Sequence, residues 1–144
     1  MLRYLSEERD YRGYVPGRGW AHAVAHTADA VDELIKIPSL PNVKRMQLLD
    51  AVRDVMANGD AVFTHNEDGR MAEAVKSSFM NIAAADKTAW IESVTAVKGK
   101  GTLPEDMYLM INLRNLLTGV YFKLPEEDAA RPVLEDAIRS INIT

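Results

Sequence analysis

Residues 102–123 of the chain, TLPEDMYLMINLRNLLTGVYFK, decide the fold. Apolar residues recur at helical spacing on most sides of this stretch, which predicts the most buried helix of the protein. Thr102 and Glu105 have the spacing of a capping box, and Pro104 suits the first turn of a helix. The helix is therefore expected to begin beside Thr102 and to run to about Lys123.

This predicted helix carries one narrow strip of small or polar residues, at Asn112, Asn115 and Gly119. Amide side chains in a buried helix need hydrogen-bond partners. We expect the two asparagines to cap a carbonyl group of a neighbouring loop. Asn115 is also kept as a ligand-binding candidate.

The rest of the chain has the same helical period. Proline, glycine and potential N-cap residues separate the periodic segments. No segment alternates with period two over a useful length, so no strand is expected. The other predicted helices cover Met1–Glu8, Trp20–Ile37, Pro41–Ala57, Asn66 to about Ala85, Asp86 to the glycines at 99 and 101, and Pro132 to about Ile141.

These elements predict an all-α fold of about six to seven helices, in a single domain over residues 1–144. Short links join the helices, so consecutive helices should be antiparallel. Pairs would start near Trp20, Glu67 and Leu103, a spacing of roughly forty residues that is typical of HEAT-like or armadillo-like repeats. We expect a HEAT/armadillo-like stack of antiparallel helical hairpins, with an irregular helical bundle as the alternative.

The predicted helix Trp20–Ile37 has two distinct sides. Trp20, Val24 and Val31 fall on an apolar side, because successive residues turn by about 100°. A polar stripe with neighbouring positions lies opposite, at His22, His26, Asp29 and Glu33. Trp20 is therefore expected in the core, and a surface position would make it a ligand-contact candidate.

The polar stripe is compatible with a metal site. Imidazole nitrogens of His22 and His26 and a carboxylate oxygen of Asp29 could bind a divalent metal such as zinc. A loop or a neighbouring helix could add His65, Asp10 or Glu67. Two alternatives stay open: the stripe is the solvent-exposed side of an amphipathic helix, or one histidine is neutral and bonded to the preceding loop.

Residues 10–19, DYRGYVPGRG, are expected to form a loop, since three glycines and a proline leave no period there. Where this loop meets the next helix, backbone amides together with Arg12 and Arg18 could hold a phosphate or a carboxylate. Arg12 is therefore a ligand-binding candidate. The favoured alternative is a tight connector whose glycines permit positive φ.

The composition, with 47% hydrophobic and 26% charged residues, is that of an ordinary soluble protein. The net charge of −4 argues against nucleic-acid binding. The absence of cysteine excludes disulfides and thiolate metal sites. No signal segment and no apolar run of about 20 residues is present, so we expect a cytoplasmic protein without a membrane partner.

Three segments of the sequence follow one family pattern. Residues 12–29, RGYVPGRGWAHAVAHTAD, show an R-G-x plus G-W-x-H-x-x-x-H-x-x-D motif. EDGR at 67–70 looks like a short E-D-x-R element, and residues 112–124 look like an asparagine-rich helix that ends around Tyr121-Phe122. With these motifs the chain resembles the bacterial domain of unknown function 2785 family over nearly its whole length.

The resemblance implies a bacterial helical protein with no established activity, substrate or catalytic residue to carry over. It also implies further helical sequence before the motif, so that this chain would be the C-terminal part of a longer protein. The residues that match the first motif have no assigned role in the family: Arg12, Trp20, His22, His26 and Asp29.

Two functions are weighed from the sequence. The first is a helical-repeat-like interaction or scaffold module with a protein partner, by analogy with curved stacks of helix pairs. The second is a metal-binding protein or a metal-dependent hydrolase that uses His22, His26 and Asp29, and whether the protein is an enzyme stays open. If the stripe faces a pocket with further acidic or histidine side chains within ligand reach, the second function gains support. If the stripe is open to solvent on a convex face, the second function fails.

Overall fold

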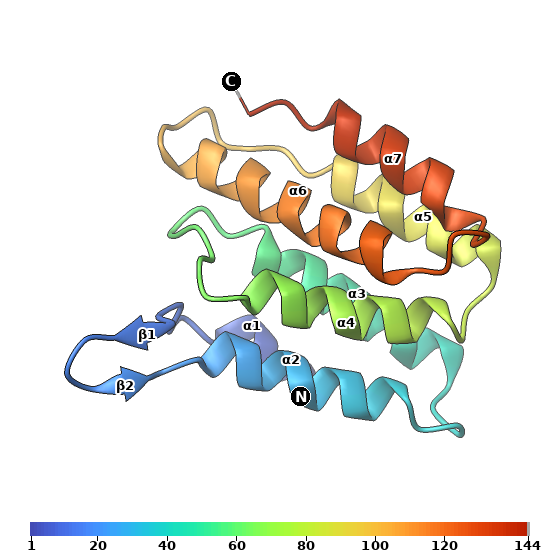
Figure 1. The fold of residues 1–144 in the computed structure, drawn as a ribbon, viewed down its shortest axis with the longest axis horizontal. Coiled ribbons are helices and arrows are strands. Elements are labelled where there is room, and N and C mark those ends of the chain that lie inside the picture. Colours follow the sequence, from blue (N-terminus) through green and yellow to red (C-terminus); the bar gives the residue numbers. More distant parts are fainter. Residues whose placement is uncertain (144) are drawn as a thin grey trace.

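The computed structural model describes residues 1–143 of the chain. Most of this part is helical, which confirms the predicted all-α class, with a two-stranded hairpin as the exception (Figure 1). The helices are α1 (Leu2–Glu7), α2 (Ala23–Ile35), α3 (Asn42–Met56), α4 (Glu67–Phe79), α5 (Ala84–Thr95), α6 (Glu105–Lys123) and α7 (Ala130–Ser140). The hairpin strands are β1 (Tyr14–Val15) and β2 (Gly19–Trp20).

The helices form two layers. In one layer α2 contacts α4, and α4 contacts α6. In the other, α1 contacts α3, α3 contacts α5, and α5 contacts α7. Figure 1 shows α2, α4 and α6 side by side, with their N-terminal ends at the hairpin end of the molecule. The helices of this layer start at residues 23, 67 and 105, close to the predicted starts near Trp20, Glu67 and Leu103.

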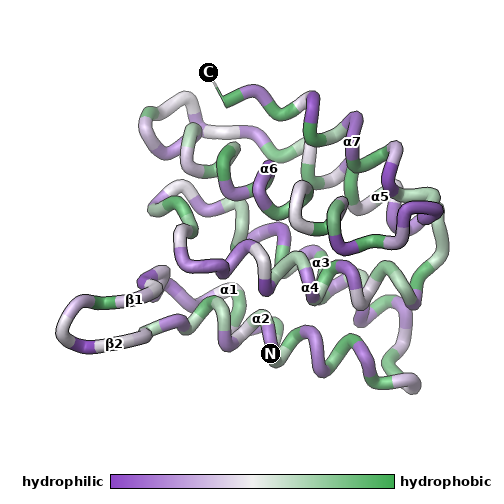
Figure 2. Tube along the Cα trace, viewed as in Figure 1, coloured by the Kyte–Doolittle hydropathy of each residue, from purple (hydrophilic) through white to green (hydrophobic). Residues whose placement is uncertain are grey.

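The core lies between the two layers. Each helix alternates between hydrophobic and hydrophilic residues along its length, as Figure 2 shows. Buried side chains of α6 include Leu113, Leu116 and Leu117. Phe79 of α4 and Trp90 of α5 meet edge to face, with ring centroids 5.7 Å apart. No helix within residues 1–143 is long and apolar enough to cross a membrane.

The expectation that α6 is buried on most sides is only partly correct. Its buried residues lie where α3, α4 and α7 pack against it. Met107 at one end is exposed, and Phe122 at the other end keeps 75% of its surface in contact with solvent. The three neighbouring helices cover only one side of α6, so an apolar sequence alone did not determine burial there.

Asn112 holds a long loop against α6. It is completely buried, and its Oδ1 accepts a hydrogen bond of 3.0 Å from the backbone N–H of Phe63. Its Nδ2 donates to the carbonyl oxygens of Ala61, at 2.8 Å, and Asn58, at 3.5 Å. The predicted capping of a neighbouring loop is therefore correct for Asn112. It is wrong for Asn115, which is exposed because it lies about 60° around the helix from Asn112.

Several predicted helix ends are wrong by a few residues. The helix expected to run from Asn66 to Ala85 ends at Phe79, and α5 begins at Ala84 rather than at Asp86. The capping box at Thr102 does not form, because Pro104 occupies the N-cap position of α6. The carboxylate of Asp106 instead accepts hydrogen bonds from the backbone N–H groups of residues 100 and 101, at 2.8 and 2.7 Å.

Candidate functional site

Residues 14–20, which were expected to form loop and then helix, fold into a hairpin. Tyr14 pairs with Trp20, and Val15 pairs with Gly19. Gly17 and Gly19 have φ values of 76° and 88°, a conformation that glycine adopts readily. The strand pairing is the reason that α2 begins only at Ala23.

The hairpin places Trp20 on the surface, so its predicted core position is wrong. Its side chain is 60% exposed, and Tyr14 contacts it edge to face with ring centroids 5.2 Å apart. The prediction assumed helical geometry from Trp20 onward, whereas the backbone there is a strand. The ring of Trp20 also lies beside the rings of His22, at 4.2 Å, and His65, at 5.9 Å between centroids.

His22 occupies the N-cap position of α2 rather than a helical position, with a left-handed backbone of φ 45°. Its backbone N–H donates to the carbonyl oxygen of Arg12, at 3.1 Å, which fixes the base of the hairpin. Its side chain points inward and is buried, unlike the exposed side chains of His26 and Asp29. Glu33 is exposed as well, so a solvent-facing stripe exists only for the three residues within the helix.

The imidazole of His22 contacts the loop before α4 and the first residue of that helix. Its Nε2 lies 3.1 Å from the carbonyl oxygen of His65 and 3.7 Å from Oε1 of Glu67. Both neighbours are acceptors, so Nε2 carries a hydrogen and donates it. Glu67 is 1% exposed, and its Oε2 accepts a hydrogen bond of 2.8 Å from the backbone N–H of His65. Its Oε1 is buried without a hydrogen-bond partner in the described part of the chain.

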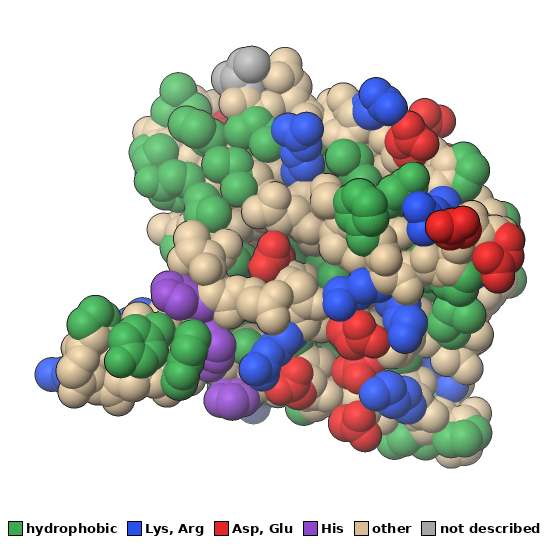
Figure 3. Space-filling model, viewed as in Figure 1, with side chains coloured by type: hydrophobic (Ala, Val, Ile, Leu, Met, Phe, Trp, Pro, Cys, Tyr) green, Lys and Arg blue, Asp and Glu red, His purple; other side chains and the backbone are tan. Residues whose placement is uncertain are grey.

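The hairpin and the starts of α2 and α4 border a pocket of about 470 Å³. We call it the histidine pocket, and it is lined by Trp20, His22, His26, His65, Asn66 and Arg70. Figure 3 shows the histidine side chains, in purple, gathered at the base of the hairpin next to its hydrophobic surface. Arg70 donates through Nη1 to Oδ2 of Asp29, at 2.7 Å, so the pocket has an ion pair at its edge.

The predicted metal set of His22, His26 and Asp29 is not assembled. The expectation required all three residues on one helical face, but His22 precedes the helix and points inward. Asp29 is paired with Arg70 instead. Across residues 1–143, no three histidine, aspartate or glutamate side chains are placed to hold a metal ion. His65 and Glu67 do lie beside His22, as two of the suggested neighbours, but as hydrogen-bonding partners.

The other candidate residues lie outside the histidine pocket. Arg12 forms two bonds with Asp10, from Nε to Oδ1 at 2.7 Å and from Nη2 to Oδ2 at 2.6 Å. These bonds hold the pKa of Asp10 at about 2. Asn115 is exposed on α6. The arginine that lines the histidine pocket is Arg70. In the sequence it was noted only as part of the EDGR element at 67–70.

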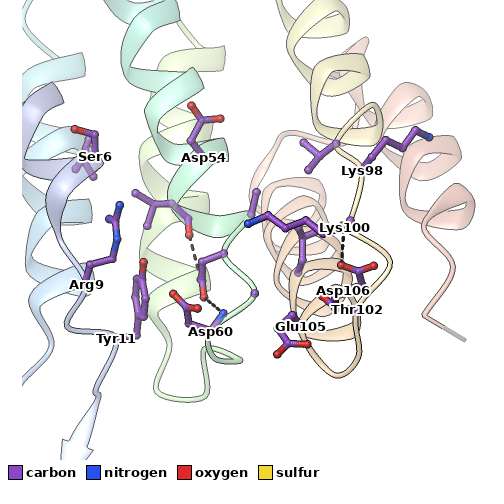
Figure 4. A pocket seen from close by; sticks show the side chains of 18 of the residues that line it. Ser6, Arg9, Tyr11, Asp54, Asp60, Lys98, Lys100, Thr102, Glu105 and Asp106 are labelled. Atoms are coloured by element: carbon purple, nitrogen blue, oxygen red, sulfur yellow. Dashed lines mark hydrogen bonds between the residues drawn. The ribbon is translucent and has the colours of Figure 1, made fainter.

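A larger pocket, of about 700 Å³, lies between α1, the C-terminal ends of α3 and α5, and the start of α6. Figure 4 shows charged side chains of both signs around it. Among them are Arg9, Asp54, Asp60, Lys98, Lys100 and Glu105. None of the residues singled out in the sequence as site candidates lines this pocket, and its mixed charges favour no single class of ligand.

The loop between α3 and α4 forms part of both pockets. Residues 57–60 line the larger pocket, and His65 and Asn66 line the histidine pocket. Asn112 bonds to the loop between these two parts, at Ala61 and Phe63. Asn112 therefore positions walls of both pockets from the core side.

The family described as protein of unknown function DUF2785 matches residues 1–122. The chain belongs to the DUF2785 family. The matched region holds the hairpin and the linings of both pockets, whereas α7 lies outside it. No curated protein and no solved structure matches the chain.

Within this DUF2785 chain, Gly13 is expected to be required for the packing of the hairpin base. A Cβ atom at this position would overlap the imidazole ring of His65. We expect Gly13→Ala to lower the free energy of unfolding by about 1–3 kcal/mol, measured by urea denaturation. In a His65→Gly background the same change should cost less than about 0.5 kcal/mol, because both the ring and the Cβ atom of His65 that it would overlap are gone. Equal costs in both backgrounds would show that the contact does not limit this position.

Proposed function

We propose that this chain is a non-enzymatic interaction module that binds a protein partner through its hairpin. The observation that carries the proposal is the exposure of Trp20, whose indole is 60% accessible at the hairpin end of the helix stack. Tryptophan, tyrosine and arginine are the residues that most often dominate binding energy in protein interfaces. A large exposed aromatic pair on a protein surface is accordingly a candidate binding site.

The hairpin presents the aromatic pair on a fixed support. Its base is held by backbone hydrogen bonds from Ala21 to Gly13, at 2.9 Å, and from His22 to Arg12, at 3.1 Å. Tyr14, 47% exposed, packs edge to face against Trp20. A pre-organised aromatic surface loses little conformational entropy when a partner binds. This arrangement supports recognition of a partner surface with an apolar pocket for the indole.

Site-specific photo-crosslinking tests the proposal. A benzophenone amino acid replaces Tyr14 on the hairpin, and in a control protein it replaces Phe122, which is 75% exposed on α6. Both proteins are irradiated in a lysate of the source organism, and the crosslinked products are identified by mass spectrometry. We expect a specific product at position 14 that is absent at position 122.

A second variant tests whether the crosslinked product depends on the indole of Trp20. Adding Trp20→Ala to the position-14 protein should reduce the crosslinking yield and the affinity for the purified partner by tenfold or more. If position 14 gives no specific product, gives the same products as position 122, or keeps its yield without the indole, the hairpin is not an interaction surface.

A further inference from the structure

We propose that the histidine pocket binds an oxyanion, a carboxylate or a phosphate group, through His22, His26 and Arg70. The lining combines three imidazoles, a guanidinium, an amide and an indole, all of which can donate hydrogen bonds. No carboxylate of residues 1–143 lines it, although the chain contains 21 aspartates and glutamates. The inference goes beyond the proposed function, since a small anion would bind here without a protein partner.

The hydrogen bonds of His22 support an anionic ligand. Its Nε2–H faces the His65 carbonyl oxygen and Glu67 Oε1, a buried oxygen without a hydrogen-bond partner among residues 1–143. The other ring nitrogen, Nδ1, is the one left for a ligand, because the ring also lines the pocket. A ring that donates from Nδ1 as well as from Nε2 can hold a ligand oxygen there, with the carboxylate of Glu67 beside Nε2.

Arg70 and His26 supply further donors from the outer side of the pocket. Arg70 uses Nη1 for Asp29, which holds the guanidinium at the pocket edge. A guanidinium has five N–H groups, so others remain for a ligand. The ring of His26 lies 6.2 Å from that of His22, between centroids. The two imidazoles and the guanidinium line the same pocket, so one oxyanion in it can reach donors of all three.

The backbone around the pocket adds to this environment. The only non-glycine residues with positive φ in residues 1–143 are His22, at 45°, and Asn66, at 68°, and both line the pocket. They are the N-cap residues of α2 and α4, and neither side chain bonds to its own helix. Both helices therefore direct the positive ends of their dipoles toward the region where the side chains converge.

NMR titration of the full chain with inorganic phosphate, and separately with acetate, tests the proposal. We expect saturable shifts of the ring signals of His22 and His26 and of the backbone amides of residues 66–70, with an affinity in the millimolar range or better. The two arms decide whether phosphate or carboxylate is the preferred oxyanion.

Variants show whether the pocket is responsible. Arg70→Gln removes the positive charge, and His26→Gln replaces the imidazole by a neutral amide. Neither side chain is in the core, and each change should weaken binding by tenfold or more. Arg114→Gln, on the exposed side of α6, removes the same charge elsewhere and should leave the affinity unchanged.

The outcomes separate this inference from the proposed function. Shifts that do not saturate with either anion, or affinities that fall equally in the Arg114→Gln control, would overturn the oxyanion site. Neither result would alter the crosslinking at the hairpin, because that experiment contains no added anion. Conversely, a hairpin without a partner would leave the phosphate and acetate titrations unaffected.

Discussion

Replacing Asn112 with leucine is expected to lower the free energy of unfolding by about 2–5 kcal/mol. Leucine fills a similar volume but offers no hydrogen bond, so the N–H of Phe63 and the carbonyl of Ala61 lose their partner in the buried interior. Each buried backbone group without a partner costs about 1–3 kcal/mol. Urea denaturation followed by circular dichroism measures the loss.

Asn115 provides a matched control for this substitution. It is the same residue type on the same helix, but it is exposed. Asn115→Leu should change the free energy of unfolding by less than about 0.5 kcal/mol. Asn112→Leu should also broaden or shift the NMR signals of residues 57–66, whereas Asn115→Leu should not. Similar losses for the two variants would show that the hydrogen bonds of Asn112 do not stabilise the loop.

The two tryptophans are expected to respond very differently to truncation. Trp90→Ala should cost about 3–5 kcal/mol, because the indole is 1% exposed and packs edge to face against Phe79. Trp20→Ala should cost less than about 1 kcal/mol, because most of the indole is already in contact with water. Thermal and urea denaturation of the two variants measure the difference directly.

Fluorescence provides an independent measurement on the same proteins. The Trp20→Ala variant retains only buried Trp90, so its emission should shift to shorter wavelength relative to the wild type. A loss of about 3 kcal/mol or more for Trp20→Ala, on the scale expected for a core indole, would place Trp20 in the core and remove the basis of the proposed hairpin interface.

The sequence was sufficient to identify the family motif, but it did not predict how the motif residues are arranged around the pocket. The spacing of His22, His26 and Asp29 indicated a common helical face, and that interpretation required helix to begin at or before His22. The backbone at Gly19 and His22 has positive φ, and the segment before it pairs as a strand. Neither feature leaves a periodic signal, because each involves only one or two residues.

The residues that complete the pocket are separated in sequence by about forty positions or more. His65 and Glu67 meet His22, and Arg70 meets Asp29, because α2 packs against α4. The packing of α2 against α4 cannot be predicted from a single sequence. The sequence suggested His65 and Glu67 as two of three neighbours for the histidines, but the larger pocket at the ends of α3 and α5 had no sequence signal at all.

By itself, the sequence determined the helical fold class, the approximate positions of the helices and the family. The helical period and the positions of proline and glycine affect the backbone within a few residues. Helices can therefore be predicted from them in a single sequence. Only the tertiary structure decided that Trp20 is exposed to solvent, that His22 points inward and that Asn112 positions the loop that lines both pockets. Those outcomes depend on strand pairing and helix packing, which bring together residues that are distant in the chain.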